Sequence, residues 1–544
     1  MVRITDDLVA CESQFKAAGI KLPHFDVENA TRNGREQPRW LHIGPGNLFR
    51  ALHAQMAQTL LDDGWMQAGL VVVGMMGAAE IDDVYGVSDN RHLIVIVGSD
   101  GSMDATLSAS VANAIYAGQG APGYAELMRV ARQPSLQMVT VSITEKGYTT
   151  RAEDNRWAPG VAADIAAGPS GATSAMGIVA AMLHARWSAG DFPIAMVSTD
   201  NFSANGDRFK QAICDIVTAW LHDGLVESDF VHYVMDRGRV SFPYTMVDRI
   251  TPNPSAEVAE RLTAAGVEGM DLVRVSESTV MAPFANTEPT WYLVVEDDFP
   301  GGRPPLEHAG VLMVNRDTVN LSDEMKVTAC LNPLHTALAV FGVPLRFDRI
   351  WREVGDADLL ALVQRLGVGE MLPVCPDPGV ISPRAFLDQV LHQRLPNPSL
   401  PDAPQRIAAD TSQKMPVRFG VALRRMIDQG VDLATLQAIP LTLAGWLRYL
   451  MGLDDDGQPV VLSPDPRLGE LTNRLSALEL GVDNSALAAS VGVPLLSEVL
   501  GVDLPATPLA SSIVAYLTDL TRGVGAIRST LHRFASEISE TSHL

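Results

Sequence analysis

Cysteine is scarce in this chain of 544 residues, which has only Cys11, Cys214, Cys330 and Cys375. The four lie far apart in the sequence and form no CxxC pair, so neither a zinc ribbon nor a disulfide framework is indicated. We therefore expect four reduced thiols, as is typical of cytosolic proteins.

Long hydrophobic runs are also lacking. No stretch of about 18 or more consecutive apolar residues occurs, so we expect no membrane-spanning helix. The first residues, MVRITDDLVACESQF, are amphipathic and carry acidic side chains early, unlike a signal peptide. The sequence thus predicts a cytoplasmic protein.

Basic residues are fewer than acidic ones, with 41 Lys and Arg against 64 Asp and Glu, and the net charge is −23. Phosphate contacts need clustered cations, so we expect no nucleic acid and no anionic membrane as partner. A small anionic substrate stays possible, because one nearby Arg or Lys outweighs a distant field that salt screens. No heptad repeat requires an assembly, so we expect a monomer or a weak homo-oligomer.

The chain is too long for one hydrophobic core, and its pattern changes near residue 303. Before that point short apolar strands, such as 70–73, 92–97 and 192–198, alternate with helical segments. This alternation is typical of βαβ units and a mainly parallel sheet. After the GGRPP loop helical periodicity dominates. We predict an α/β domain over 1–303, which opens with a helical lead-in, and a mainly helical domain over 304–544.

The string HIGPGNLFR lies between a predicted strand and a predicted helix. Gly44 and Gly46 stand where a dinucleotide fold needs a tight turn and a close approach to pyrophosphate, which the helix N-terminus also attracts. The third glycine of the usual fingerprint is replaced by Phe49. The order of strand, turn, helix and second strand nevertheless favours a cofactor site over an ordinary turn. The candidate cofactor residues are Gly44, Gly46, Asn47, Phe49, Arg50 and Asp248.

The acid that usually binds the ribose at the end of the second strand is not obvious in this sequence. The strand LVVV continues into GMMGAA, and Glu80 is the first acid after it. The residues therefore leave the choice between NAD and NADP open.

A segment of the second half, 323–342, carries the side chains that alcohol oxidation needs. It places Lys326, Asn332 and His335 in a mostly apolar setting. A lysine that apolar walls desolvate can serve as the base for the hydroxyl proton. An asparagine amide can donate to the developing oxygen anion, and a histidine can orient the substrate hydroxyl. The alternative is a surface lysine and a core histidine with ordinary partners.

Two segments of the first half carry polar residues after apolar strands. VSTDNFSANGD contains Asp200, Asn201 and Asn205, and FPYTMVDRITP, which we interpret as a polar loop, contains Asp248 and Arg249. Open α/β folds place ligands at the carboxyl ends of strands, so these residues are candidates for a ligand site. Loops held by internal hydrogen bonds are the alternative.

Taken in order, HIGPGNLFRALH, SITEKGYTT, STDNFSANG, FPYTMVDRITP, WYLVVEDDF and KVTACLNPLH resemble the long-chain mannitol dehydrogenase family over nearly the whole chain. That family includes mannitol 2-dehydrogenase, fructuronate reductase and tagaturonate reductase. The resemblance implies a Rossmann-like, doubly wound NAD-binding domain, a helical substrate and catalytic domain, and a dehydrogenase that needs no metal. It also implies that Lys326 is the general base, Asn201 and Asn332 hold the reacting oxygen, His335 and Arg394 contact the substrate, and Glu145 lies near a proton path.

One departure from the family concerns spacing. Asn332 and His335 each lie one residue further from Lys326 than in the family's commoner pattern. At about 100° per residue, a regular helix would put Lys326 and His335 on opposite sides. Pro333 lacks a backbone donor and clashes with the preceding turn. We therefore predict an irregular turn between Lys326 and His335, and a regular helix there would contradict the proposed triad.

Lys146, in ITEKGY, is the one hint about the substrate, because polyol-oxidising members tend to carry glycine there. Lys146 could pair with a carboxylate, with help from Arg394 or Lys414. This favours a sugar-acid substrate, with fructuronate reduced to mannonate or tagaturonate to altronate. With a solvated Lys146 the alternative is a polyol 2-dehydrogenase that interconverts fructose and mannitol.

Two other classes are disfavoured. A non-catalytic sugar or nucleotide sensor would have no need of Lys326 and the asparagines, which are all present. A dehydrogenase of phosphorylated or β-hydroxy acids would need a cluster of Arg and Lys, and none is evident in the catalytic segment.

Overall fold

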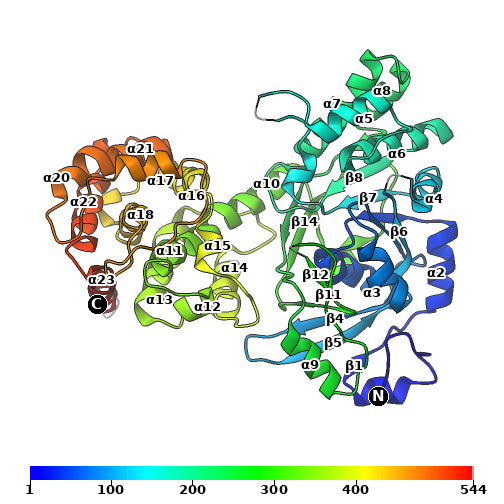
Figure 1. Ribbon diagram of the computed structural model, residues 1–544, viewed down its shortest axis with the longest axis horizontal. Helices are drawn as coiled ribbons and strands as arrows, with labels where there is room; N and C mark the ends of the chain where they lie inside the picture. The colour runs from blue at the N-terminus through cyan, green and yellow to red at the C-terminus, as the bar shows by residue number, and fades with distance from the viewer. Residues whose placement is uncertain (119, 153, 278, 542–544) are drawn as a thin grey trace. The chain divides into compact units, whose positions relative to one another are not determined.

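The computed structural model describes residues 1–118, 120–152, 154–277 and 279–541. The chain divides into two compact units, Met1–Asn320 and Leu321–Leu544, each described here by itself (Figure 1). The boundary lies beyond the expected residue 303. Strand β15 (Leu312–Val314) pairs in parallel with β14 (Tyr292–Glu296), and this pairing keeps the residues after 303 with the first unit.

The first unit is built around a six-stranded parallel sheet, which confirms the predicted doubly wound fold. Its strand order is β6-β3-β2-β7-β8-β9, so the direction of winding reverses between β2 and β7. The strands are β2 (Trp40–Ile43), β3 (Leu70–Gly74), β6 (Val111–Tyr116), β7 (Met138–Val141), β8 (Ile194–Ser198) and β9 (Val240–Ser241).

Helices cover both faces of this sheet, so its strands are apolar on both sides. Successive residues of a strand point to opposite faces. Leu41 and Ile43 therefore join a core with α4 (Pro122–Ala131), α6 (Ala175–Gly190) and α7 (Asn205–His222). Trp40 joins the core on the other face with α3 (Ala54–Asp62).

Smaller sheets complete the first unit. They are β1-β5-β4-β13, β10-β14-β15 and the hairpin β11-β12. The predicted strand at 92–97 is confirmed as β4, but it pairs antiparallel with β5 instead of joining the main sheet. The strands are β1 (Ile20–Lys21), β4 (His92–Val97), β5 (Met103–Ser108), β10 (Thr245–Asp248), β11 (Val273–Arg274), β12 (Val280–Met281) and β13 (Phe284–Thr287); the remaining α-helices are α1 (Glu12–Ala17), α2 (Val27–Glu36), α5 (Pro159–Ala167), α8 (Ser228–Met235) and α9 (Ala256–Ala264).

The second unit is helical, as predicted, and runs from lime to red in Figure 1. Its centre is α18 (Ala438–Leu450), every residue of which is buried. A Cβ added to Gly445 would come 2.4 Å from the Phe341 ring, so the lack of a side chain lets α11 (Asn332–Gly342) pack closely on α18. The other α-helices are α12 (Ile350–Glu353), α13 (Ala357–Gln364), α14 (Pro383–Gln389), α15 (Pro404–Ile407), α16 (Thr411–Met415), α17 (Val421–Asp428), α19 (Leu468–Arg474), α20 (Ser485–Leu487), α21 (Val493–Leu500), α22 (Leu509–Leu520) and α23 (Ala526–Thr541), and α10 (Arg316–Met325) carries the chain into this unit.

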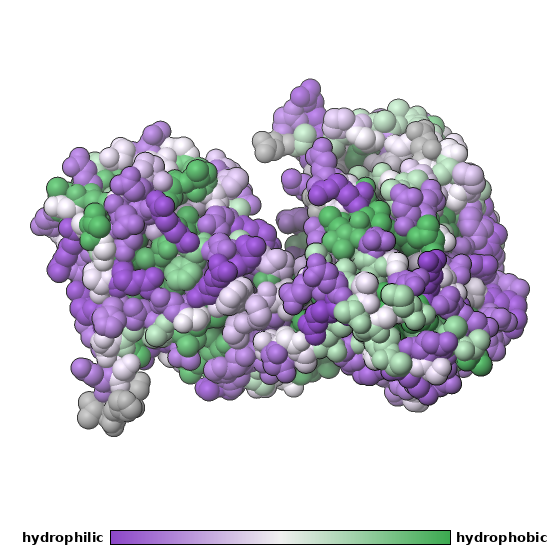
Figure 2. Space-filling model, turned by 60° about the horizontal axis from the view of Figure 1, so that its bottom comes forward, coloured by the Kyte–Doolittle hydropathy of each residue, from purple (hydrophilic) through white to green (hydrophobic). Residues whose placement is uncertain are grey.

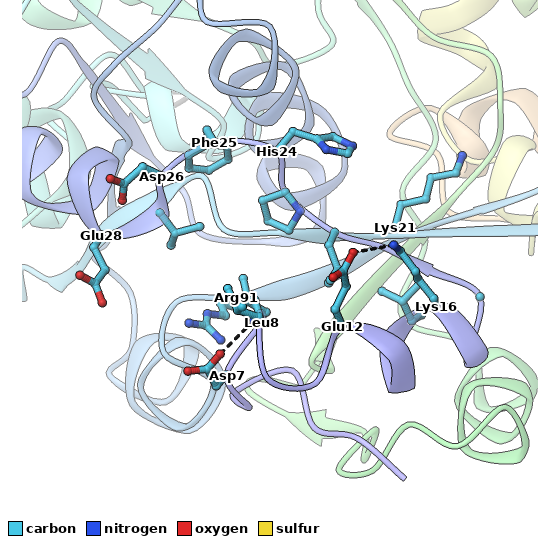
Figure 3. A pocket seen from close by; sticks show the side chains of 16 residues that line it. Asp7, Leu8, Glu12, Lys16, Lys21, His24, Phe25, Asp26, Glu28 and Arg91 are labelled. Carbon is cyan, nitrogen blue, oxygen red and sulfur yellow. Dashed lines mark hydrogen bonds and ion pairs between the residues drawn. The ribbon is translucent and has the colours of Figure 1, made fainter.

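Hydrophilic residues cover most of the visible face of each unit, with smaller apolar groups between them (Figure 2). Within the described residues, no helix combines the length and the apolar character that crossing a bilayer requires. A pocket of about 820 Å³ lies in the N-terminal lead-in of the first unit (Figure 3). Several of its charged groups have partners: Lys16 pairs with Glu12, and Arg91 donates to two main-chain carbonyl oxygens. None of the candidate site residues lines this pocket.

Candidate active site

The glycine turn lies at the carboxyl edge of the parallel sheet, where the winding reverses. Gly44 follows β2 with φ 111°, and a Cβ there would come 2.1 Å from the Ser142 carbonyl oxygen just after β7. Gly46 has open space around it, and the helix begins directly afterwards at Asn47. Gly44 thus lets two strands end close together, while Gly46 leaves room for a pyrophosphate at the helix N-terminus. The residues present fit a dinucleotide.

The other residues of this turn point into the protein interior. The Arg50 guanidinium is buried and donates to the Ala282 carbonyl oxygen at 2.5 Å and to Asn47 Oδ1 at 2.6 Å. The Asn47 amide nitrogen in turn donates to two main-chain carbonyl oxygens. Phe49 is buried and stacks on His42, with ring centroids 4.6 Å apart. Their side chains stabilise the turn, so contacts from these three residues to a cofactor would come from the backbone.

The core beneath the turn holds neutral histidines. Burial lowers the pKa of His53 and of His92 to about 3, and it lowers the pKa of His42 well below its usual range. The His42 ring contacts the Thr140 hydroxyl at 2.7 Å and the Ser142 hydroxyl at 2.9 Å. These rings therefore carry no charge at neutral pH.

The FPYTMVDRITP segment is not the polar loop that we expected. Residues Thr245–Asp248 form strand β10, which pairs antiparallel with β14, and all four of its residues are buried, with Val247 in the core. Asp248 is buried at the end of this strand, and the Arg249 guanidinium donates to the Glu288 carbonyl oxygen and to Gln55 Oε1. A role for Asp248 in cofactor binding stays a prediction.

Asp200 joins the loops that follow β7 and β8. Its carboxylate accepts hydrogen bonds from the backbone N–H groups of Ile143 at 2.9 Å and Thr144 at 2.8 Å, and from the Tyr148 hydroxyl at 2.7 Å. Burial raises the pKa of Asp200, while these donors oppose the rise. Asp200 is therefore a positioning residue that holds the ITEKGY turn beside the STDN loop.

Three candidate residues lie at this edge of the sheet and are exposed: Glu145, Lys146 and Asn201. The first two belong to the short helix η4 (Glu145–Tyr148), and Glu145 forms an ion pair with Arg208. Asn205 is different, because it is buried and its amide binds the backbone and hydroxyl of Thr245. The structure thus brings Glu145, Lys146 and Asn201 to one edge and assigns Asn205 a structural role.

The predicted irregular turn in the second unit is confirmed. Residues Lys326–Cys330 form a π-helical turn, η6, in which the Leu331 N–H donates to the Lys326 carbonyl oxygen at 3.2 Å. Leu331 leaves the helical conformation with φ −129°, and α11 begins at Asn332 with Pro333 in its first turn. A π-turn accommodates one residue more than an α-turn, so it absorbs the extra residue between Lys326 and Asn332.

Lys326 is 1% exposed, so it is not the surface lysine of the alternative interpretation. Its Nζ lies 3.5 Å from Asp323 Oδ1, one turn earlier. Lys326 is thus an interior amine at the start of a distorted turn, and its role in proton transfer stays a prediction.

His335 and Arg394, 59 residues apart in the sequence, line one small pocket of the second unit. Asn397 and Asp402 also line it. Burial lowers the pKa of His335 to about 4, Asp402 opposes the shift, and nearby arginines, Arg418 and Arg394 among them, add to it. The imidazole is therefore neutral near pH 7 and can exchange a hydrogen bond with a substrate hydroxyl.

Sequence reasoning missed Arg418, which donates to the Thr336 hydroxyl at 2.6 Å and to the Asn332 carbonyl oxygen at 3.3 Å. A lone arginine in the apolar run following MPV was the available signal. Lys414, which we considered for the substrate carboxylate, donates to the carbonyl oxygens of Ile407 and Ala409 instead. Burial lowers the pKa of Lys414 to about 8.

A glycine turn at the switch point of a parallel sheet, together with a buried lysine that precedes an asparagine and a histidine, defines a dehydrogenase of the Rossmann class. No group of three or more potential metal ligands occurs among the described residues.

Comparison with known proteins gives the family. The mannitol dehydrogenase Rossmann domain matches residues 38–308, and the mannitol dehydrogenase C-terminal domain matches 319–490. D-mannonate oxidoreductase of Thermotoga maritima is 40% identical over 97% of this chain and 98% of that protein. Polyol:NADP oxidoreductase of Gluconobacter oxydans is 27% identical over 84% and 88% of the two chains.

Among solved structures, D-sorbitol dehydrogenase in substrate-free form has the same fold. It is 24% identical with a TM-score of 0.78, over 94% of this chain and 97% of that chain. The chain belongs to the mannitol dehydrogenase family, and it is an NAD(H)-dependent dehydrogenase that acts on CH–OH groups.

Proposed function

We propose that this enzyme interconverts a keto-uronate and a sugar acid, with reduction of D-fructuronate to D-mannonate as the main reaction. The observation that carries the reaction type is Lys326, which is buried at the π-turn directly before Asn332 and His335. The substrate class is supported by the 40% identity, over nearly the full length of both chains, to a protein named D-mannonate oxidoreductase.

In the proposed reaction the first unit holds the cofactor. Gly44 and Gly46 would admit the pyrophosphate to the helix N-terminus, with Asn47, Phe49 and Arg50 stabilising the turn. NADH, when bound, supplies the hydride. The cofactor choice has support in the charges after β3, because no Lys or Arg occurs from residue 74 to residue 90 to meet a 2′-phosphate. This pattern agrees with NAD.

The second unit would handle the proton. We assign Lys326 as the acid that protonates the oxygen anion formed from the keto group, and as the base in the reverse reaction. The Asn332 amide would donate a hydrogen bond to the same oxygen, and Asn201 is its proposed partner from the first unit. His335, neutral at pH 7, would bind a neighbouring hydroxyl. Glu145 stays the candidate for proton exchange with solvent, and Arg394 the candidate for substrate contact.

Tagaturonate and fructose are the competing substrates. The polyol reading has support in the Gluconobacter oxydans relative, which is named for polyols. A cytoplasmic location and a monomeric or weakly oligomeric state remain predictions.

The test is NADH consumption at 340 nm with fructuronate, tagaturonate and fructose side by side. We expect rapid turnover with fructuronate and, at most, slow turnover with fructose. A preference for fructose would contradict the proposal and make this enzyme a polyol dehydrogenase. A preference for tagaturonate would keep the reaction type and change the substrate.

A further inference from the structure

Arg418 is a cation beside the candidate catalytic helix that has only neutral partners. It lies in the π-turn η10 (Pro416–Gly420), between α16 and α17. Both of its hydrogen bonds leave from Nη1, one to the Thr336 hydroxyl and one to the Asn332 carbonyl oxygen. In the described part of the chain, no carboxylate forms an ion pair with this guanidinium. Its Nε and Nη2 groups are therefore not engaged by the protein.

The structural arginines of this molecule look different. Arg186, which is buried, donates from all three of its nitrogens to five main-chain carbonyl oxygens. Arg448 is also buried, and it donates from all three to three carbonyl oxygens. A guanidinium withdrawn from water needs such partners or a counter-ion. Arg418, which is half-buried, has neither in full, although burial is enough to lower its pKa to about 10.

The surroundings of Arg418 favour an anion. Three arginines and one aspartate act on the nearby His335: Arg394, Arg406, Arg418 and Asp402. The Asp402 carboxylate pairs with Arg406, so its charge is already balanced. The positive charge on Arg418 remains near a neutral imidazole. A planar guanidinium with two adjacent N–H groups available binds a carboxylate in a bidentate manner.

We propose that Arg418 binds the substrate carboxylate and thereby selects keto-uronates over neutral ketoses. The inference rests on the proposed function and assigns the carboxylate contact to a residue of the second unit. The geometry agrees, because Arg418 binds Thr336 one turn of α11 after Asn332, whose amide would hold the keto oxygen. In fructuronate the keto and carboxylate carbons are four bonds apart, so one substrate spans a distance of this order.

The test compares Arg418→Gln with Arg424→Gln. The control residue lies in the adjacent α17, and its guanidinium donates to the carbonyl oxygens of Leu500 and Gly501, away from this site. For Arg418→Gln we expect kcat/KM with fructuronate to fall roughly 100-fold, mainly through KM, because a charge-assisted contact is lost. With fructose we expect a change below about threefold, as an uncharged CH₂OH group replaces the carboxylate. Arg424→Gln should leave both values near those of the wild type.

A binding measurement separates recognition from chemistry. The dissociation constant of D-mannonate, measured by calorimetry with NAD present, should rise roughly as much as KM, while the unfolding midpoint stays near that of Arg424→Gln. If Arg418→Gln does not fold, Arg418→Lys takes its place. This variant keeps the positive charge but loses the two parallel N–H donors of the guanidinium, so it should weaken mannonate binding about tenfold.

The outcomes distinguish two failures. If the wild type reduces fructuronate but Arg418→Gln (or Arg418→Lys in its place) affects fructuronate and fructose alike, or neither, the carboxylate role is overturned and the proposed function stands. If the wild type reduces fructose and no keto-uronate, both the proposed function and the carboxylate role of Arg418 are overturned.

Discussion

The glycine turn of the first unit and the π-turn of the second prepare their surroundings for ligands in opposite ways. At the glycine turn the proposed space for the cofactor comes from the backbone, at Gly44 and Gly46, although the helix that follows also opens with a π-helical turn, η1 (Phe49–His53). At the π-turn η6 the proposed chemistry comes instead from side chains, Lys326 above all. Binding a large common cofactor needs backbone shape, whereas moving a proton needs one precisely placed amine.

We expect the largest loss of turnover from a substitution at Lys326. Lys326→Ala should lower turnover by roughly 10³-fold, because the proton-transfer group is lost. Stopped-flow or steady-state NADH oxidation with fructuronate measures this effect. Lys210→Ala, an exposed lysine of α7, is the control and should keep full activity. Turnover near that of the wild type in Lys326→Ala would remove Lys326 as the proton donor.

Gly44→Ala should have the next largest effect, on both stability and cofactor binding. The positive φ and the Ser142 carbonyl oxygen leave no room for a Cβ, so we expect a loss of about 2–4 kcal/mol in the free energy of unfolding. Denaturant unfolding measures this loss. Gly46→Ala is the matched variant, since its Cβ would meet nothing within 4 Å, and its unfolding should be unchanged. Equal stability losses in the two variants would contradict the geometry.

Acid should weaken the first unit through its buried histidines. The pKa of His53 is about 3 when folded, and that of an unfolded histidine is near 6.5, so between these values the unfolded chain binds more protons. The stability contribution is full above about pH 6.5 and falls with pH, by about 2 kcal/mol at pH 5. His53→Leu should flatten the dependence of unfolding on pH from 7 to 5. An unchanged slope would show that the His53 ring is charged in the folded protein.

In the second unit the buried carboxyl of Glu353 has the opposite effect on the pH dependence of stability. Burial raises the pKa of Glu353 well above its usual range, so the folded state holds a proton that the unfolded state releases. Its contribution to the free energy of unfolding is present at low pH and is lost as the pH rises through the pKa of Glu353 in the folded protein. His53 and Glu353 therefore contribute to acid stability with opposite signs.

Lys146→Gly should give the smallest effect. Lys146 is exposed, and an exposed ion pair contributes only about 0.2–1 kcal/mol, so kcat/KM for fructuronate should fall no more than about fivefold. Steady-state kinetics with fructuronate and fructose measure the selectivity. Equal changes for both substrates would remove Lys146 from carboxylate recognition.

The same contrast explains what the sequence could predict. The strands of the main sheet are short continuous apolar runs, and the glycine turn is local, so both were visible. The π-turn was predictable because one extra residue and Pro333 lie inside a single segment. The position of Arg418 beside the catalytic segment was not predictable, because its hydroxyl partner, Thr336, is 82 residues away in the sequence and only folding brings the two together.

The pairing of β4 and the existence of β10 were not predicted, and each has a physical cause. β4 and β5 form an antiparallel hairpin across the turn at Ser99–Ser102, and an isolated apolar run does not show whether its partner is parallel. β10 belongs to a three-stranded sheet whose other strands lie about 50 to 70 residues further along. Its polar end resembles a loop until those partners are known.

The most direct test of the division between the two turns is equilibrium NADH titration, by nucleotide fluorescence, of Gly46→Ala and Lys326→Ala side by side. We predict that Gly46→Ala raises the dissociation constant about tenfold or more, because its Cβ would occupy the space proposed for the pyrophosphate. Lys326→Ala should bind NADH within about twofold of the wild type, since its amine acts on the substrate oxygen. Wild-type affinity in Gly46→Ala, or an equal loss in Lys326→Ala, would contradict the account.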